Sequence, residues 1–553
     1  MTFDFEATDW NKLYSVAIYD GTSVKSIIDK KKDNSYFVEY LLDNIPNKEI
    51  AYAHYGGKYD FKFILDYIKK RPDIKITNYL FIHGSLVRFA IKYDHKKIEF
   101  RDSYNILPSS LKKLTIDFNV THKKLSIDYE LAEHNDNITE YIDNDVMGLY
   151  EVLQQSEVLT ERLTVASGAM HMYIKRFYKD KPERNHDRID DYFRNAYYGA
   201  RVEIFKMYGK ELNYYDVNSL YPYVMSKYDY PIIDKDNYIP SKTPSRNNGI
   251  YLCNVTCPKT ITIPLLPVRH ENKLIFPTGT WRGYYTNREI IKAREIGYKI
   301  DIISGYEFIE NEHIFKEYVN HFYNIKKTSQ GAKREIAKLM LNSLYGKFGQ
   351  RRTITTYKLI DYSKKELPSV ILGTGSGLDF YPTEQYNGYA PYLHSEIAAI
   401  ITSNARLELY NLIEKAGTDN VYYCDTDSII TDTQLPTGTG LGELKNEHYV
   451  NEFIALAPKV YAIKSGEDIF MRAKGFNIDK IKYDDFRNAL FNNDYSNFKS
   501  TFSRIATLSE TIRNRVTNFS DLYELNRTFK NRYDKRAMVD GYNTKPLNIH
   551  SDM

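Results

Sequence analysis

The sequence has no long apolar run, few cysteines and little net charge. No hydrophobic stretch approaches the roughly 20 residues that span a bilayer, so we expect no membrane partner. Three cysteines are too few for a disulfide framework. Cys253 and Cys257 have no second cysteine or histidine pair nearby, which favours small strand residues over a metal site. A net charge of +4 does not by itself indicate a nucleic-acid partner, although local basic patches permit one.

The start of the chain carries no signal-peptide pattern. Asp4 and Glu6 stand where such a peptide has basic and then apolar residues, so we expect a cytoplasmic protein. Hydrophobic residues make up 42% of the chain and aromatic residues 14%, which indicates a folded globular protein. A length of 553 residues allows several domains, each with its own core.

Hydrophobic periodicity suggests how the chain is organised. Residues 1–150 alternate strand signals such as TFDFEAT with helix signals such as ITEYIDNDVMGLYEVLQQ, which predicts an α/β domain. A turn-rich connector over 235–250 leads to the β-rich stretch GIYLCNVTCPKTITIPLLPV, followed by helical patterns from about 287 to 349. Loop and hairpin signals over 365–391 precede a helix, SEIAAIITSNARLELYNLIEKAG. The last 70 residues or so are basic and polar without a strong period.

Two aspartates interrupt an otherwise apolar strand pattern in VYYCDTDSII, residues 421–430. Side chains alternate along a strand, so Asp425 and Asp427 are predicted to point the same way, although aspartate is a poor strand former. Two like charges side by side need either a solvated hairpin tip or a cation. Mg²⁺ fits the second alternative, because it binds one or two carboxylates together with substrate phosphates.

A partner for this pair lies upstream, in NYYDVNSLYPYVM. Asp216 closes a strand-like run there, and Tyr221 follows one turn into the next predicted helix. Asp216 and Asp427 can together hold two metal ions about 4 Å apart, the arrangement that stabilises the attacking and leaving oxygens in phosphoryl transfer.

A third stretch, IAKLMLNSLYGKFG, is predicted to be helical over 336–349. Lys338, Asn342 and Tyr345 recur at i, i+4 and i+7, so they share one helix face. A cation, an amide and a ring suit the triphosphate, sugar and base of a nucleotide; the alternative is an amphipathic surface stripe. Gly346 allows close backbone approach. Three upstream residues add positive charge for a triphosphate: Lys326, Lys333 and Arg334.

The segments DVNSLYP, KLMLNSLYGKFG and YCDTDS, in this order, resemble motifs A, B and C of family B DNA polymerases. Their wording is most similar to the protein-primed branch of phages and linear plasmids, and the resemblance covers the chain from about residue 3 to 480. It implies that Asp216, Asp427 and the Val217 carbonyl bind metal, with Asp425 nearby. It also implies two Mg²⁺ ions in the polymerase site, for which Mn²⁺ can substitute.

The same resemblance assigns a nucleotide site. Tyr221 is the ring expected to exclude a ribose 2′-hydroxyl, and Tyr345 is expected to support the nascent base pair. Lys338 and Lys326 are expected to bind the incoming triphosphate. The full set of residues assigned to the nucleotide is Leu220, Tyr221, Lys326, Lys338, Asn342 and Tyr345.

A second set of carboxylates occurs near the N-terminus. FDFEAT places Asp4 and Glu6 on one strand face, and Tyr141 and Asp145 share one helix face. With Asp60, they resemble the three motifs of proofreading 3′–5′ exonucleases. The resemblance implies two more Mg²⁺ ions that activate water against the terminal phosphodiester, with Tyr141 orienting that water. The residues assigned to this reaction are Asp4, Glu6, Asp60, Lys124, Tyr141 and Asp145.

Two positions depart from the exonuclease pattern. The second motif usually has an asparagine shortly before its aspartate, but Tyr55, Gly56 and Gly57 stand there. Ala7 follows Glu6 where a threonine is usual. Both positions normally touch the single-stranded primer end. We therefore expect the metal chemistry to survive with an altered grip on the frayed end.

Further segments are predicted to contact DNA. NAYYGARVEIF resembles the family's Y-x-G-(G/A) segment, in which glycine lets the backbone approach a phosphate and tyrosine can stack. PKVYAIK matches a K-x-Y motif that contacts the primer strand. The residues assigned to DNA are Ser103, Tyr197, Gly199, Ala200, Lys459 and Tyr461.

The predicted fold is a multidomain combination of α/β and α+β units. An RNase H-like 3′–5′ exonuclease domain precedes a right-hand polymerase of palm, fingers and thumb. Two extra segments match in position the insertions of the protein-primed branch. The expected domains are the exonuclease over 1–160, the palm over 161–227 and 389–483, insertion 1 over 228–313, the fingers over 314–349, insertion 2 over 350–388 and the thumb over 484–553.

The sequence thus predicts a protein-primed replicative DNA polymerase with proofreading and strand displacement. By the resemblance, insertion 1 contacts a terminal protein and insertion 2 encircles DNA. Expected partners are a DNA primer–template, dNTPs and the terminal protein, with the chain a monomer or a heterodimer with that protein, phage-encoded and in a bacterial cytoplasm. The alternatives are a nucleic-acid-primed family B polymerase, an exonuclease alone and a non-catalytic DNA-binding derivative. The last two have no need of Asp216, Asp427, Lys338 and Tyr345.

Overall fold

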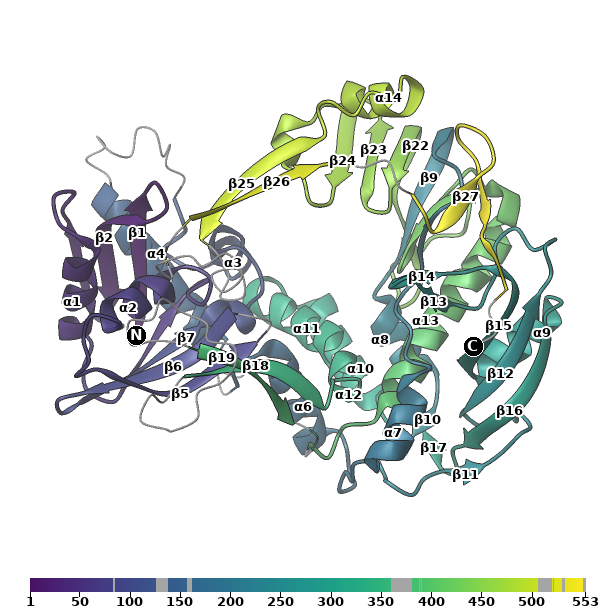
Figure 1. The fold of residues 1–553 in the computed structure, drawn as a ribbon, viewed down its shortest axis with the longest axis horizontal. Helices are drawn as coiled ribbons and strands as arrows, with labels where there is room; N and C mark the ends of the chain where they lie inside the picture. Colours follow the sequence, from purple (N-terminus) through teal and green to yellow (C-terminus); the bar gives the residue numbers. More distant parts are fainter. Residues whose placement is uncertain are drawn as a thin grey trace.

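The computed structural model describes residues 1–82, 85–125, 138–156, 162–359, 380–386, 388, 390–505, 520, 522–529 and 533–550. An N-terminal domain lies on one side and a larger body on the other, with helices between them and a long hairpin arching across the top (Figure 1). Among these residues, no helix combines the length and the apolar character needed to cross a bilayer.

The N-terminal domain is built on a seven-stranded mixed sheet. Strands β1, β4 and β7 run parallel and the other pairs are antiparallel, as expected of an RNase H-like domain. Across the sheet the strands are β3 (Val24–Ile28), β2 (Lys12–Tyr19), β1 (Thr2–Thr8), β4 (Glu49–Ala53), β7 (Lys96–Asp102), β6 (Ser85–Tyr93) and β5 (Lys75–Ile82). The helices of this domain are α1 (Asn34–Asn44), α2 (Asp60–Ile68), α3 (Leu111–Asp117) and α4 (Ile138–Gln155).

Side-chain alternation along β1 separates the core of this domain from its acidic residues. Phe3 and Phe5 are buried with the apolar side chains of α1 and α2. On the other face of the strand, the Thr2 hydroxyl donates to the Val146 carbonyl of α4 (2.7 Å). Residues two apart share a face, so Asp4 and Glu6 also project toward α4. One short strand therefore anchors an aromatic core and presents two carboxylates.

A second seven-stranded sheet, antiparallel throughout, carries the twin aspartates. Across it lie β24 (Asp468–Ala473), β23 (Val460–Ser465), β22 (Leu444–Ala457), β9 (Tyr208–Val217), β21 (Ser428–Thr431), β20 (Val421–Asp425) and β8 (Val202–Ile204). Tyr215 and Ile429 share a core with α13 (Ser395–Ala416). This helix is buried on nearly every side, which its small and apolar residues allow. The helix predicted before the aspartates is confirmed.

A five-stranded sheet lies beside the second one (Figure 1). Its strands are β11 (Ile239–Pro240), β16 (Lys299–Glu307), β12 (Gly249–Cys257), β15 (Thr278–Thr286) and β29 (Asn548–His550). The helical patterns expected from about 287 to 349 include α9 (Asn287–Glu295), but a strand interrupts them, because α9 stops before Gly297 and β16 pairs with β12. Cys253 and Cys257 are buried free thiols of β12, as predicted for strand residues.

The remaining helices and short strands connect these sheets. The helix predicted over 336–349 is two helices, because a bend at the fully buried Leu344 separates α11 (Gly331–Ser343) from α12 (Tyr345–Phe348). The others are α6 (Val165–Arg176), α7 (Asp187–Arg194), α8 (Leu220–Lys227), α10 (Lys316–Thr328) and α14 (Tyr483–Phe491), with the strand pairs β10 (Tyr230–Pro231) and β17 (Asn311–Glu312), and β13 (Val268–His270) and β14 (Lys273–Ile275).

Two hairpins reach the N-terminal domain (Figure 1). The first, β18 (Thr353–Leu359) with β19 (Phe380–Tyr386), packs on β5: the rings of Tyr357 and Phe380 each lie 5.5 Å from that of Phe81. The rest of the expected second insertion, 360–379, lies outside the described residues. The second hairpin is β25 (Lys499–Ile505) with β26 (Leu522–Thr528). Between these strands, the Ser520 hydroxyl donates to Asp66 of α2 (2.5 Å).

The end of the chain, within the expected thumb over 484–553, forms strands of its own. Residues 533–550 return to the larger body, where β27 (Arg536–Met538) pairs with β28 (Thr544–Pro546) and β29 pairs with β15. Tyr533 and Arg536 are buried there. The sequence of this segment is polar and has no hydrophobic period, so it did not predict that the segment packs on the larger body. Isolated buried side chains such as Tyr533 and Arg536 hold it there.

The aromatic core of the N-terminal domain yields a stability prediction. Phe89 is fully buried, with its ring 4.9 Å from that of Phe100 and 5.2 Å from that of Phe61. Phe89→Ala should lower the free energy of unfolding by about 3–5 kcal/mol, because it leaves a cavity. Urea unfolding followed by fluorescence measures the change. Ile116→Ala, at a side chain 55% exposed, should change it by less than about 0.5 kcal/mol. Equal effects of the two variants would contradict the assigned core.

Candidate active sites

The first candidate site forms where strands β9, β20 and β21 meet. Asp216, near the end of β9, pairs with Ser428 of β21. The Val217 N–H donates to the Asp427 carbonyl (2.8 Å), so Asp427 lies next to Asp216. The strand register therefore brings together two aspartates that are far apart in sequence.

A tight turn separates Asp425 from Asp427, so the continuous strand over 421–430 is wrong and the hairpin tip given as its alternative is present. Thr426 has φ +62°, and the Asp427 N–H donates to the Asp425 carbonyl (2.7 Å). The two carboxylates therefore do not follow strand alternation. Asp425 instead accepts bonds from Lys459 Nζ at 2.7 and 2.8 Å. The hairpin separates a carboxylate paired with lysine from one beside Asp216.

Burial and mutual repulsion raise the pKa values of the two adjacent carboxyls. Burial, followed by the charges of Asp427 and Glu447, raises the pKa of Asp216 to about 7, and Lys445 opposes the shift. Burial and the charge of Asp425 raise the pKa of Asp427 to about 6. A hydrogen bond from its own backbone N–H and the charge of Lys459 oppose this shift. A divalent cation would relieve this repulsion, and carboxylate oxygens are the donors that Mg²⁺ prefers.

Lys445 and Glu447 did not stand out in the sequence. Lys445 pairs with Asp216 across β22 and β9, and its ammonium binds Glu447 at 2.9 Å. Only strand pairing places them at the site, so no local pattern could reveal them.

Lys326 lies near Asp216 and near two further cations, Lys338 and Arg334. Lys326 on α10 donates to the Ser219 hydroxyl (2.8 Å), directly before α8. Burial and the neighbouring charges of Lys338 and Arg334 lower the pKa of Lys326, while Asp216 opposes the shift. A bound polyanion would relieve the repulsion among the cations.

Three tyrosines singled out in the sequence form one cluster. The rings of Tyr221 and Tyr345 stack with centroids 4.5 Å apart and planes 6° apart. Burial and the neighbouring Tyr345 raise the pKa of Tyr197. The Tyr197 ring lies against Gly349, where a Cβ would come within 2.4 Å of it. Two further residues were predicted to contact the nucleotide. Asn342 is exposed on α11, whereas the Leu220 side chain is buried.

The segment after Tyr197 is held from behind. Arg406 of α13 donates to the carbonyls of Tyr198 (2.9 Å) and Gly199 (3.1 Å). A Cβ at Gly199 would meet no heavy atom within 4 Å, and Ala200 is half-buried. Backbone at Gly199 is therefore fixed on one side and open on the other.

The K-x-Y segment divides between site and core. Lys459 holds Asp425, as described above. The Tyr461 ring is 7% exposed and lies 5.4 Å from that of Tyr423 inside the sheet. Its ring is therefore part of the packing beneath Asp425.

The second candidate site lies between β1 and α4. Carboxylate oxygens of Asp4, Glu6 and Asp145 all lie within 4.8 Å of one another, the one such cluster of potential metal ligands within the described part of the chain. Lys124 forms an ion pair with Asp145, and its Nζ lies 4.7 Å from the centre of the Tyr141 ring. The structure thus brings together residues of three separate sequence motifs.

Asp60 lies at the edge of this cluster. It is the first residue of α2, and its carboxylate accepts the Phe5 N–H (3.1 Å). Burial raises the pKa of Asp60 to about 8 and that of Glu6 to about 7, where Lys124 opposes the shift. Burial and the charges of Asp60 and Glu6 raise the pKa of Asp4. One ammonium among two buried and two half-buried acids leaves net negative charge that suits divalent cations.

Asp102 is a further acid that the sequence did not single out. It ends β7, accepts the N–H groups of Gly57 (3.2 Å) and Tyr104 (3.0 Å), and its charge contributes to the raised pKa of Asp60. Burial raises its own pKa to about 6. Strand pairing places it there, because β7 ends beside β4, and the sequence alone does not show this pairing.

Tyr55, one of the departures from the family pattern, builds an aromatic stack. Its ring lies 3.8 Å from that of Tyr104 at 29°, and Lys58 Nζ lies 5.0 and 5.2 Å from the two ring centres. Tyr55 has φ +67°, an unusual conformation for an aromatic residue. Ser103, assigned to DNA from the sequence, has no exposed surface, and its hydroxyl donates to the Ala53 carbonyl (3.1 Å). Its side chain is therefore not available to DNA in this structure.

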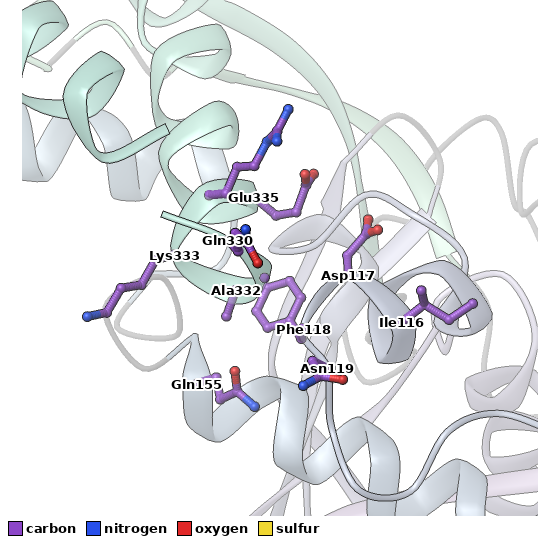
Figure 2. A pocket seen from close by; sticks show the side chains of 11 residues that line it. Ile116, Asp117, Phe118, Asn119, Gln155, Gln330, Ala332, Lys333 and Glu335 are labelled. Carbon is purple, nitrogen blue, oxygen red and sulfur yellow. The ribbon is translucent and has the colours of Figure 1, made fainter. Parts of the chain in front are cut away.

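A cavity of about 790 Å³ lies apart from both carboxylate groups, between the N-terminal domain and the start of α11 (Figure 2). A Cβ at Gly331 would lie 3.4 Å from the Asp117 carbonyl, so α11 begins close to α3. Labelled residues around it are Ile116, Asp117, Phe118, Asn119, Gln155, Gln330, Ala332, Lys333 and Glu335. The cavity lies where α11, which carries Lys333 and Arg334, meets the N-terminal domain.

Comparison with known families and proteins gives consistent matches. Residues 43–145 and 133–385 match the family model described as DNA polymerase type B, organellar and viral. A probable DNA polymerase of Podospora anserina is 28% identical over 82% of this chain, and one of Neurospora intermedia is 25% identical over 81%. The chain spans about half the length of these relatives, 47% and 55% respectively.

A DNA-directed DNA polymerase of Enterobacteria phage PRD1 is 28% identical over 86% of this chain and 85% of its own length. Among solved structures, phi29 DNA polymerase complexed with single-stranded DNA superposes with a TM-score of 0.74. The superposition covers 96% of this chain and 100% of the phi29 DNA polymerase chain, and the two sequences are 21% identical. This similarity confirms the predicted fold class.

The raised pKa values in the second site predict pH-dependent metal binding. Metal binding requires ionised carboxylates, and a group with a pKa of about 7, such as Glu6, is only about one tenth ionised at pH 6. In a variant with Asp216→Asn and Asp427→Asn, which removes the first site, Mn²⁺ should therefore bind about tenfold more tightly at pH 8 than at pH 6. Electron paramagnetic resonance of free Mn²⁺ measures this affinity, and adding Asp4→Asn should weaken binding at both pH values. Equal affinity at the two pH values would contradict the assigned electrostatics.

Proposed function

Because this chain belongs to the organellar and viral type B DNA polymerases, we propose that it extends DNA primers by two-metal nucleotidyl transfer and removes 3′-terminal nucleotides at a second site. The observation that carries the proposal is that Asp427 lies next to Asp216, close to Lys326 and its neighbouring cations. A magnesium-bound nucleoside triphosphate has both charges that this arrangement accepts.

In the polymerisation reaction, Asp216, Asp427 and the Val217 carbonyl are the groups that hold Mg²⁺. When bound, the two ions activate the primer hydroxyl and stabilise the leaving pyrophosphate. Asp425 stays paired with Lys459 and adds negative charge behind Asp427. Mn²⁺ has the same preference for oxygen ligands and is proposed to substitute.

The basic group positions the triphosphate. Lys326 is oriented by its bond to Ser219, and Lys338 projects from the next helix, α11. Both ammonium groups bind phosphate oxygens in this proposal, with Asn342 further along the same helix. Charge neutralisation by the triphosphate then removes the repulsion that lowers the pKa of Lys326.

The stacked rings of Tyr221 and Tyr345 form one wall of the nucleotide site. Their stacking restricts both rings, so Tyr221 can exclude a 2′-hydroxyl by bulk and Tyr345 can support the base pair. Tyr197 and the open backbone at Gly199 are proposed to contact DNA phosphate and bases. Lys459, beside Asp425, is proposed to contact the primer strand.

In the exonuclease reaction, Asp4, Glu6, Asp60 and Asp145 are the groups proposed to hold two metal ions. When bound, these ions supply an activated water for attack on the terminal phosphodiester. Lys124, fixed by Asp145, lies over the Tyr141 ring and so sets the position of both side chains. Tyr141 is proposed to orient the attacking water.

Protein priming is the proposed mode of initiation, with a terminal protein as partner, insertion 1 as its contact and the chain alone or in a heterodimer with it. Support comes from the wording of the three motifs and from the β-rich unit between α8 and α10, which occupies the position of that insertion. Strand displacement by insertion 2 and Mg²⁺ as the physiological ion belong to the same proposal. Initiation on a nucleic-acid primer is the alternative, and failure to use any terminal protein would favour it.

Asp427→Asn separates the two proposed reactions. Primer extension with Mg²⁺ and dNTPs should fall by at least about a hundredfold, because one metal ligand loses its charge. Primer degradation without dNTPs should persist, since the second site lies in another domain. The matched variant Asp432→Asn alters an exposed aspartate after β21 and should extend primers normally. If the unmodified protein extends nothing, the polymerase proposal fails.

The aromatic stack predicts how the second site holds a single strand. Stacking on one aromatic ring contributes about 1–3 kcal/mol per base. Tyr55→Gly removes the ring and relieves the positive φ, so it should raise the KM for degrading a single-stranded oligonucleotide about tenfold with little change in kcat. Tyr55→Phe keeps the ring and should leave KM unchanged. Degradation kinetics measure both, and an unchanged KM in Tyr55→Gly would show that the stack does not hold the strand.

A further inference from the structure

The edge strand next to the twin aspartates is completed by side chains from the end of the chain. β8 pairs with β20 on one side, and an edge strand leaves its outward backbone groups without strand partners. Here the Ile204 N–H donates to the Tyr533 hydroxyl (2.8 Å), and the Ile204 carbonyl accepts from the Thr544 hydroxyl (2.9 Å). The Val202 carbonyl accepts from Lys535 Nζ (3.2 Å). The C-terminal segment 533–550 thus replaces a neighbouring strand.

A buried charge cluster ties the same segment to β8. Glu203 is fully buried, and its carboxylate lies 2.6 Å from Arg201 Nη2 and 3.6 Å from Arg536 Nη1. Arg536 also donates to the Thr262 carbonyl (2.8 Å) and the Thr544 hydroxyl (2.9 Å). Removing one member of such a cluster leaves charge buried without its partner, so the three side chains hold one another in place.

The cluster connects directly to the turn between the aspartates. The Arg201 carbonyl accepts the Thr426 N–H (2.8 Å). Thr426, at φ +62°, is β-branched and holds a conformation that costs roughly 1–3 kcal/mol unless its surroundings enforce it. Arg201 thus holds the residue that sets the spacing of Asp425 and Asp427.

We propose that Arg536 is a positioning residue for polymerisation. It fixes Glu203 and, through it, Arg201, so that the Thr426 turn holds Asp427 at the spacing from Asp216 that two metal ions require. The inference rests on the proposed polymerase function. It extends that function to a residue more than a hundred positions beyond the aspartates, in a segment that the sequence placed in the thumb.

The molecule contains its own control for general unfolding. The N-terminal domain has a separate aromatic core, and neither that core nor the cluster of Asp4, Glu6 and Asp145 includes residues from 533–550. Loss of positioning at Thr426 should therefore reduce extension and leave degradation intact, whereas a purely structural defect should lower the melting temperature and reduce both.

The test compares Arg536→Met with Lys545→Met, which removes the same charge at an exposed position of β28. Both are assayed on primed single-stranded DNA with a Mg²⁺ titration, and on the same DNA without dNTPs. Arg536→Met should lower kcat for extension by at least about tenfold and raise the Mg²⁺ concentration for half-maximal rate, because misplaced aspartates affect the chemical step. The KM for dNTP and the degradation rate should stay within about twofold. Arg536→Lys should recover part of the rate, and Lys545→Met should match the unmodified protein.

Several outcomes would overturn the inference. Unchanged extension by Arg536→Met would exclude a positioning role, and a parallel loss of extension, degradation and melting temperature would leave a structural role only. If Arg536→Met does not fold, Tyr533→Phe decides, because it deletes only the hydroxyl that accepts the Ile204 N–H: slower extension with intact degradation supports the inference, and no effect overturns it. A protein that extends no primer in any form refutes the proposed function instead.

Discussion

Repulsion between carboxylates held close together in a partly buried environment is the constraint on which both candidate sites depend. In the first site, burial and then neighbouring negative charge raise the pKa values of Asp216 and Asp427, and in the second site they do so for Asp4, Glu6 and Asp60. Each site neutralises one acid internally, through Lys459 on Asp425 and Lys124 on Asp145. Among the described residues the remaining acids form no ion pair, although Lys445 opposes the raised pKa of Asp216 and Lys124 that of Glu6, and these acids are the ones that a divalent cation would join.

The first site adds the opposite charge a short distance away. Burial and the charges of Lys338 and Arg334 lower the pKa of Lys326, while Asp216 and Asp427 repel one another nearby. Neither group can relieve the other fully, because Lys326 is directed to Ser219. A metal-bound triphosphate brings cations to the acids and phosphates to the lysines at once. In the proposed reaction, this separation of positive and negative groups therefore favours a metal-bound triphosphate, whichever base the nucleotide carries.

The sequence predicted what depends on local pattern and residue type. Alternation placed Asp4 and Glu6 on one face of β1, and α13 appears where its apolar run indicated. The strand predicted over 421–430 failed because a left-handed Thr426, stabilised by the distant Arg201, has no local signature. Asp102, Lys445 and Glu447 reach their sites only through strand pairing, which a single sequence does not reveal. For the same reason the role of 533–550 was missed.

The two sites share one chain without sharing one core, and this shapes how each is controlled. Tyr357 and Phe380 belong to the aromatic core of the N-terminal domain, so the hairpin β18–β19 is packed as part of that domain although it follows α10, α11 and α12 in sequence. At the end of the chain, β29 joins the five-stranded sheet of β12, β15 and β16. Segments inserted into or trailing the polymerase body are thus fixed to elements far away in sequence. A change in one of these contacts would therefore alter one active site selectively, because each core stabilises its own carboxylates.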